Sequence, residues 1–300
     1  MPKARFTSTD NRQMEVEYET FGDPSHPALL MIMGYSAQMT AWPEGFIKML
    51  ANEGYFVIRF DNRDCGLSTH LDGVFVDVGP VIAAALFDDP IPPIPYTLVD
   101  MAGDAIAVLD HLGIERAHVA GMSLGGMVSQ VVAYTHPHRV MTLTSISSQP
   151  GDPEVGQPTM EASAVIFEEA PAGMSREDYI ESSLNWQVWQ SKKYRDDNLS
   201  RTAAAFQYDR AFYPEGATRQ LAAVYGTGRR HDQVATISVP TLVIHGTDDT
   251  LITPSGGERT AELVPNSTLV MVDDMGHDLP QPLWPLLTNA IVDHLSRVQA

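Results

Sequence analysis

The chain has 300 residues, of which 44% are hydrophobic and 19% are charged, and its formal net charge is −19. This length suits one large α/β domain with an inserted subdomain, or two ordinary domains, and needs no disulfide or metal for stability. A strongly acidic surface repels phosphate groups, which argues against binding to nucleic acid or to an anionic membrane surface.

Cysteine content and hydropathy indicate in which cellular compartment the protein is expected. Cys65 is the only cysteine, which excludes an intrachain disulfide and fits a reducing environment. The first residues do not form the apolar run of a signal peptide. No stretch approaches the roughly 20 apolar residues of a transmembrane helix. We therefore expect a cytoplasmic protein without a membrane span.

Short apolar runs alternate with longer amphipathic stretches along most of the chain. Residues 4–21 predict an antiparallel strand pair at a sheet edge. Six short apolar runs predict buried strands, at residues 28–33, 55–60, 117–121, 140–146, 241–245 and 268–272. Helical periodicity appears at residues 97–112, 124–135 and 281–298. This alternation predicts an α/β fold with a mostly parallel central sheet and flanking helices, whose reacting groups lie beyond the carboxyl ends of the strands.

Two segments interrupt this alternation. Residues 72–96 are rich in proline and apolar side chains, which predicts a long apolar loop with a functional role. Residues 153–233 show helical periodicity and many aromatic residues, but no strand pattern. We interpret them as a helical cap inserted into a core that is formed by residues 1–152 and 234–300.

The strongest chemical signal is a G-x-S-x-G motif at residues 121–125, with Ser123 at its centre. The motif alone should arise by chance in about one chain in ten of this length. Here it lies between the predicted strand at 117–121 and the predicted helix at 124–135, which is the setting of a nucleophile elbow. Ser123 is therefore the predicted nucleophile.

A serine hydroxyl needs a neighbouring base to take its proton. Among the ten histidines, His277 follows the last predicted strand, where the order serine, acid, histidine places the base. His245 lies inside a predicted strand and is expected to be packed and hydrogen-bonded. The remaining histidines fit surface or packing positions, and we predict no metal site.

The acid should follow a strand and precede His277. Asp248 and Asp249 directly follow the strand at 241–245 and qualify equally on spacing. The three aspartates nearest to His277 are too close in sequence for a contact between two loops, and we expect them to be solvated: Asp273, Asp274 and Asp278.

An oxyanion hole needs two backbone donors. One should be the N–H of Leu124, directly after the nucleophile. The other should come from the loop after the strand at 28–33, and we favour the N–H of Tyr35.

These features together resemble the α/β-hydrolase family over nearly the whole chain, and within it small-molecule carboxylesterases such as the aclacinomycin methylesterases. In that family the acid occupies the last position of G-x-x-D, so the resemblance implies Asp249 rather than Asp248. It also implies Tyr35 as the second oxyanion donor, where relatives often carry glycine. The matching stretches are residues 21–24, 33–34, 42–43, 59–64, 66–68, 121–126, 240–246 and 276–277.

The resemblance implies a serine hydrolase that cleaves carboxylic esters of small lipophilic molecules through an acyl-enzyme intermediate, without a cofactor. The segment at 72–96 is longer than the carboxylesterases would need, and we expect it near the active-site mouth. Carbon–carbon bond hydrolases, lactonases and cofactor-free perhydrolases share the triad and stay open, and a non-catalytic ligand receptor is a further alternative. Four candidates for the substrate pocket are Gly34, Met122, Trp186 and Phe212, although cap aromatics more often pack the cap itself.

Overall fold

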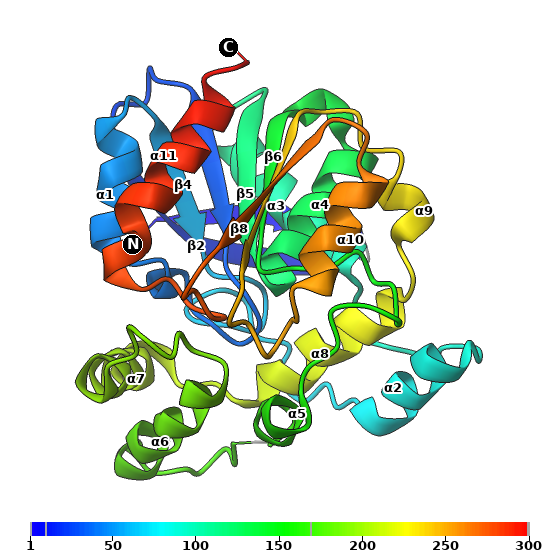
Figure 1. Cartoon of the computed structure of the whole chain (residues 1–300). Helices are drawn as coiled ribbons and strands as arrows, with labels where there is room; N and C mark the ends of the chain where they lie inside the picture. The colour runs from blue at the N-terminus through cyan, green and yellow to red at the C-terminus, as the bar shows by residue number, and fades with distance from the viewer. Residues whose placement is uncertain (1, 10, 169, 299–300) are drawn as a thin grey trace.

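A computed structural model describes residues 2–9, 11–168 and 170–298. Its centre is an eight-stranded sheet in the order β1-β2-β4-β3-β5-β6-β7-β8, with helices on both faces (Figure 1). β2 pairs antiparallel with both β1 and β4, and the other pairings are parallel. The strands are β1 (Lys3–Thr7), β2 (Gln13–Phe21), β3 (Ala28–Ile32), β4 (Phe56–Phe60), β5 (Ala117–Met122), β6 (Val140–Ile146), β7 (Thr241–Gly246) and β8 (Ser267–Val272).

The central strands are buried on both faces, which explains their uninterrupted apolar sequences. All residues of β3 and β4 are buried. Successive side chains of β3 enter opposite cores: Leu30 and Ile32 pack with α3 (Leu98–His111) and α4 (Leu124–Thr135). Leu29 and Met31 pack instead with the core that includes α1 (Glu44–Asn52) and α11 (Trp284–Leu295). The predicted antiparallel edge pair and the six predicted strands are all present in this sheet.

The remaining helices cover the two faces of the sheet or belong to the segment between β6 and β7. In Figure 1 that segment lies below the sheet, at the ends of the strands. Within the described part of residues 153–233 it contains helices and no strand, and its separation as a cap domain stays a prediction. These helices are η1 (Met39–Ala41), α1 (Glu44–Asn52), α2 (Val78–Phe87), η2 (Pro137–Arg139), α5 (Met160–Ile166), α6 (Arg176–Ser182), η3 (Ser183–Val188), α7 (Asp197–Ala211), α8 (Glu215–Thr227), α9 (His231–Val234), α10 (Ser255–Leu263), η4 (Gln281–Leu283) and α11 (Trp284–Leu295).

The prediction of a loop at residues 72–96 was wrong for residues 78–87, which form α2. The carboxylate of Asp77 caps the helix by accepting a hydrogen bond from Gly79 N at 3.1 Å. Pro80 lies in the first turn, where its missing N–H costs nothing, and the alanines that follow favour a helix. Val81 then packs in a small apolar cluster with Ala222 of α8, so α2 is held against the helical segment.

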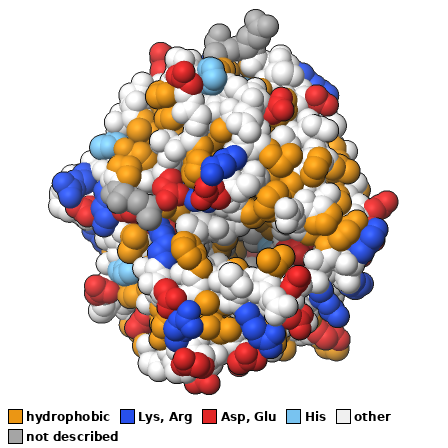
Figure 2. All heavy atoms as spheres, turned by 90° about the vertical axis from the view of Figure 1, so that its left-hand side faces the viewer, with side chains coloured by type: hydrophobic (Ala, Val, Ile, Leu, Met, Phe, Trp, Pro, Cys, Tyr) orange, Lys and Arg blue, Asp and Glu red, His pale blue; other side chains and the backbone are white. Residues whose placement is uncertain are grey.

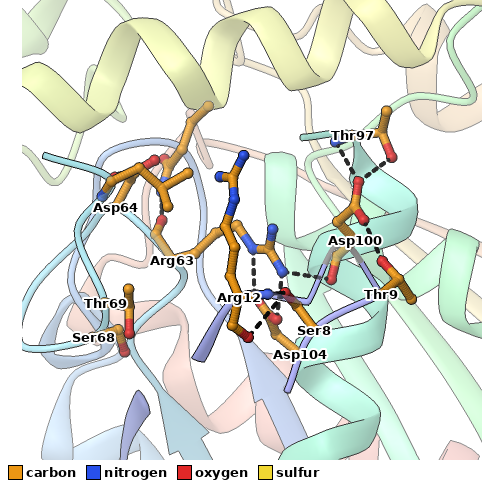
Figure 3. Close-up of polar contacts among 12 residues, drawn as sticks. Ser8, Thr9, Arg12, Arg63, Asp64, Ser68, Thr69, Thr97, Asp100 and Asp104 are labelled. Atoms are coloured by element: carbon orange, nitrogen blue, oxygen red, sulfur yellow. Dashed lines mark hydrogen bonds and ion pairs between the residues drawn. The ribbon is translucent and has the colours of Figure 1, made fainter. Parts of the chain in front are cut away.

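A polar network fixes the loop after β4, which precedes α2. Arg63 donates from Nε and Nη2 to the two carboxylate oxygens of Asp104 on α3, both at 2.6 Å, and both side chains are buried (Figure 3). At the start of the same helix, Asp100 accepts a hydrogen bond from Thr97 Oγ1 at 2.8 Å and one from Thr9 Oγ1 at 2.9 Å (Figure 3). The loop, the first hairpin and α3 are therefore joined.

Two buried ion pairs connect the same loop to helices α7 and α8. Arg210 of α7 lies 2.8 Å from Asp61, and Arg219 of α8 lies 2.8 Å from Asp64. All four side chains are almost fully buried. Gly216 completes the contact, because a Cβ there would lie 1.9 Å from the carbonyl oxygen of Asp64. No helix among the described residues is long and apolar enough to cross a bilayer.

Candidate active site

Ser123 occupies the sharp turn between β5 and α4. Its φ of 58° and ψ of −124° lie outside the regions that non-glycine residues favour, so the turn is strained. The flanking glycines are required by close packing. A Cβ at Gly121 would lie 2.1 Å from Gly125 O, and a Cβ at Gly125 would lie 2.0 Å from Ile32 O. The motif thus gives the backbone geometry of a nucleophile elbow.

Neighbouring strands hold this turn in place. Ser123 N donates to Ile146 O of β6 at 2.9 Å, and Ser148 Oγ donates to Ser123 O at 2.8 Å. Gly34, after β3, packs against the serine, since a Cβ at Gly34 would lie 3.6 Å from Ser123 Oγ. The Ser123 side chain lines a cavity together with Tyr35 and Leu124. The hydroxyl therefore sits at the carboxyl ends of the central strands and beside this cavity.

Asp249 and His277 meet beyond the ends of the last two strands. His277 Nδ1 and Asp249 Oδ2 are 2.7 Å apart. The second oxygen of Asp249 accepts hydrogen bonds from Leu251 N and Ile252 N, both at 3.0 Å. Of the two aspartates that spacing left open, the structure brings Asp249 to the histidine, whereas Asp248 is part-exposed.

The environment keeps Asp249 ionised. Burial alone would raise its pKa, but the positive charge of a protonated His277 and hydrogen bonds from His245 and His277 lower the pKa of Asp249 to about 2. A carboxylate in this position orients the imidazole and stabilises its protonated form.

His245 is a second histidine beside the same carboxylate. Its Nε2 lies 2.8 Å from Ile252 O and 3.5 Å from Asp249 Oδ2, and the side chain is fully buried. The expectation of a packed, hydrogen-bonded residue agrees with this position. Sequence reasoning did not predict that His245 lies beside Asp249. The separation of only four residues between them, at the end of β7, was the signal that could have indicated it.

The loop that carries His277 is bound to the segment after η3. His277 N donates to Trp189 O at 2.7 Å, and Ser191 N lies 3.2 Å from each carboxylate oxygen of Asp278. Asp278 is therefore part-buried and hydrogen-bonded, and not fully solvated as expected. Burial outweighs its hydrogen bonds and raises the pKa of Asp278 to about 6.

The predicted oxyanion donors lie on the loop after β3 and at the first residue of α4. The amino terminus of a helix favours negative charge, which suits the position of Leu124 N. Gln220 of α8 fixes the other loop: its Oε1 accepts from Ser36 N, and its Nε2 donates to Arg63 O, both at 2.8 Å. Sequence reasoning did not find Gln220, because nothing in the sequence of α8 marks it.

The cavity beside Ser123 has mostly apolar walls, which include Met127, Leu221 and Ile252. Leu86 of α2 also lines it, so the segment at 72–96 reaches the cavity. Polar side chains lie on its lining as well, among them Gln149 and Arg230.

The four predicted pocket residues lie in different places. Gly34 packs against Ser123, and Met122 directly precedes it in the sequence. Neither residue is part of the lining of this cavity. Trp186 and Phe212 do not line it either. Their rings pack against Tyr179, with centroid distances of 5.9 and 5.2 Å, in an aromatic cluster of the helical segment. Among residues 2–9, 11–168 and 170–298, no group of three or more His, Cys, Asp or Glu side chains is placed to bind a metal.

Comparison with known proteins shows the family to which the chain belongs. Residues 27–280 match the family model described as alpha/beta hydrolase fold. Rhodomycin D methylesterase DauP from Streptomyces sp. strain C5 is 28% identical over 92% of this chain and 93% of its own. 3-Oxoadipate enol-lactonase 2 from Acinetobacter baylyi is 25% identical over 91% of each chain.

Solved structures show the same fold. The esterase RhEst1 from Rhodococcus sp. ECU1013 superimposes with a TM-score of 0.73 at 20% identity, over the full length of both chains. The enol-lactonase from Burkholderia xenovorans LB400 gives a TM-score of 0.72 at 20% identity, over 97% of this chain and 99% of its own. The fold class expected from the sequence is thereby confirmed.

Proposed function

Because the chain belongs to the α/β hydrolase fold family, we propose that it is a serine hydrolase that cleaves carboxylic esters of small lipophilic molecules. The observation that carries the proposal is the combination of Ser123 at a strained strand–helix turn on an apolar cavity with the Asp249–His277 pair at 2.7 Å. The methylesterase relatives support an ester as the bond that is cleaved.

The first half-reaction forms the acyl-enzyme. Ser123 Oγ attacks the ester carbonyl carbon while His277 takes the hydroxyl proton. The negative charge that develops on the carbonyl oxygen is held by the N–H groups of Tyr35 and Leu124. His277 then gives its proton to the departing alcohol, and Asp249 stabilises the imidazolium between these two steps.

The second half-reaction releases the acid. Water attacks the acyl carbonyl as His277 removes its proton, the same donors hold the second oxyanion, and the protonated histidine returns a proton to Ser123. The residues of the site supply every proton transfer in this sequence. The apolar cavity walls favour an acyl group that is largely hydrocarbon.

The test is the initial rate of hydrolysis of p-nitrophenyl esters from acetate to palmitate, with wild type beside Ser123→Ala. We expect turnover by the wild type, a rate maximum at one chain length that reflects the cavity, and no turnover by Ser123→Ala. Turnover that persists in folded Ser123→Ala, or a folded wild type that hydrolyses none of the esters, would contradict the proposal.

A lactonase or a carbon–carbon bond hydrolase is a second candidate that uses the same residues. The observations in its favour are the enol-lactonase at 25% identity and a relative named 2-hydroxy-6-oxononadienedioate/2-hydroxy-6-oxononatrienedioate hydrolase, 29% identical over 57% of this chain. Product analysis separates the candidates, because a lactone gives one hydroxy acid whereas an ester gives an acid and an alcohol.

A further inference from the structure

Arg230 is a buried cation on the wall of the cavity that contains Ser123. Only 2% of the residue is exposed. Its Nη2 donates to the carbonyl oxygen of Gln149 at 3.0 Å, and its Nε has no hydrogen-bond partner. Among the described residues, no carboxylate lies within ion-pair distance of its guanidinium. A buried charge without a counter-ion is costly, so its retention calls for a ligand or another compensation.

The neighbouring charges are already neutralised. Arg229 contacts both carboxylate oxygens of Asp88 at 3.0 Å, and Glu154 lies 3.6 Å away. Asp152, which lines the same cavity, pairs with Arg259 at 3.0 Å. Arg230 is therefore not the partner of these carboxylates, although it is next to Arg229 in sequence.

Arg230 remains a cation near neutral pH. Burial lowers its pKa to about 10, and the nearby Tyr134 acts in the opposite direction. A guanidinium in this state offers planar N–H donors that match a carboxylate.

The backbone around Arg230 holds the guanidinium in place. A Cβ at Gly151, whose φ is +82°, would lie 3.0 Å from Arg230 Nη1 and 2.8 Å from Gly228 O. The absence of a side chain at Gly151 therefore leaves room for the guanidinium beside the cavity. Together with the hydrogen bond to Gln149 O, this packing fixes the group before any ligand binds.

The backbone of Arg230 directly precedes α9, whose Val234 packs with Ala133 near the carboxyl end of α4. Ser123 and Leu124 lie at the amino end of the same helix. The lining of the cavity that contains Ser123 and Arg230 also includes Met127 of α4 and Val224 of α8. The cavity thus offers a nucleophile, an apolar middle and a cation.

We propose that Arg230 is a specificity-determining residue that binds a carboxylate on the acyl part of the substrate. The substrate class is then a half-ester of a dicarboxylic acid, with its ester carbonyl at Ser123, its hydrocarbon chain along Met127 and Val224, and its free carboxylate at Arg230. This inference rests on the proposed ester hydrolysis and specifies its substrate.

The experiment compares two series of methyl esters of equal chain length: monomethyl esters of dicarboxylic acids from succinate to sebacate, and methyl esters of the matching monocarboxylic acids. Released methanol gives kcat/KM for each. We expect the wild type to prefer the half-ester at one chain length. Arg230→Met should lower the ratio of half-ester to neutral-ester kcat/KM about ten- to hundredfold, the usual effect of losing a charge-assisted hydrogen bond.

Two further variants serve as controls. Arg230→Lys keeps the charge without the planar donors, and we expect an intermediate ratio. Arg229→Met removes a second arginine of the same cavity lining, one that is already paired with Asp88 and Glu154, and the ratio should change less than twofold. A wild type that hydrolyses neutral esters at least as well as half-esters at every length would overturn the proposal while leaving ester hydrolysis intact. An equal loss on both series in Arg230→Met would assign Arg230 a structural role and also overturn it.

A binding measurement separates this proposal from the catalytic one. In Ser123→Ala, dicarboxylates from succinate to sebacate should raise the melting temperature, and this shift should disappear in Ser123→Ala/Arg230→Met. If no ester is hydrolysed, the proposed function fails, but a shift that depends on Arg230 would still support carboxylate binding. If no dicarboxylate shifts the melting temperature of Ser123→Ala, the assignment of Arg230 is wrong.

Discussion

At the scale of single residues, the proposed catalysis depends most on Asp249, whose proposed role is to hold His277 in the tautomer that can accept the Ser123 proton. Asp249→Asn retains the shape of the side chain but removes its negative charge, and we expect kcat to fall by about 10⁴. Initial rates on one p-nitrophenyl ester measure the effect, with Asp248→Asn as the matched control. Full activity in Asp249→Asn together with a large loss in Asp248→Asn would show that Asp248, and not Asp249, is the acid that orients His277.

Asp278 gives a prediction about pH. Its pKa is raised to about 6 in the folded protein from an ordinary value of 3.8. The folded state therefore binds the proton more tightly, and the resulting stability is fully present below about pH 4 and lost as the pH rises through about 6. Asp278→Asn removes this dependence. We expect the melting temperature of the variant, relative to wild type, to be higher at pH 7.5 than at pH 4.5, and an identical difference at both pH values would contradict the pKa shift.

The sequence was sufficient to find some of these residues and not others. Ser123 and His277 follow from a motif in its strand–helix setting and from chain order. Spacing left Asp248 and Asp249 equal, because only the turn geometry after β7 decides which carboxylate reaches His277. The partial burial of Asp278 and the unpaired charge of Arg230 depend on contacts between segments far apart in the chain, which no local pattern reveals.

At the scale of elements, the Arg63–Asp104 pair is the clearest determinant of stability. Both side chains are buried, so Asp104→Asn would leave the guanidinium without its counter-charge. We expect a loss of about 3–5 kcal/mol in the free energy of unfolding, measured by denaturant titration. The exposed Arg176–Asp209 pair is the control, and Asp209→Asn should cost at most about 1 kcal/mol. Equal losses in the two variants would show that burial does not determine the effect.

The strands were easier to predict than α2. Strands that are buried on both faces read as continuous apolar runs, and this pattern is local. In residues 72–96 the high proline content concealed a helix, because the prolines lie in its first turn or beyond its end, where they do not interrupt it. The capping residue Asp77 and the alanines of α2 were the signals that should have outweighed composition.

At the scale of the whole molecule, alternating strands and helices predicted the architecture because a parallel sheet requires helical crossovers. The position of the helical segment relative to the sheet could not be predicted, since it depends on buried pairs such as Arg219–Asp64. Acidic and basic side chains are interspersed with apolar ones over the face in Figure 2. On this face the acidic residues do not form a single patch, so the acidic net charge marks no binding site there.

The most direct test of the central claim is covalent labelling of the folded protein with a fluorophosphonate, followed by mass spectrometry of the peptides. A serine activated by His277 and Asp249 should take up one label, on the peptide that contains Ser123, and Ser123→Ala should take up none. Labelling should also fail after denaturation, because activation depends on the folded geometry. A folded protein that stays unlabelled, or carries its label on another residue, would contradict the assignment of Ser123 as the nucleophile.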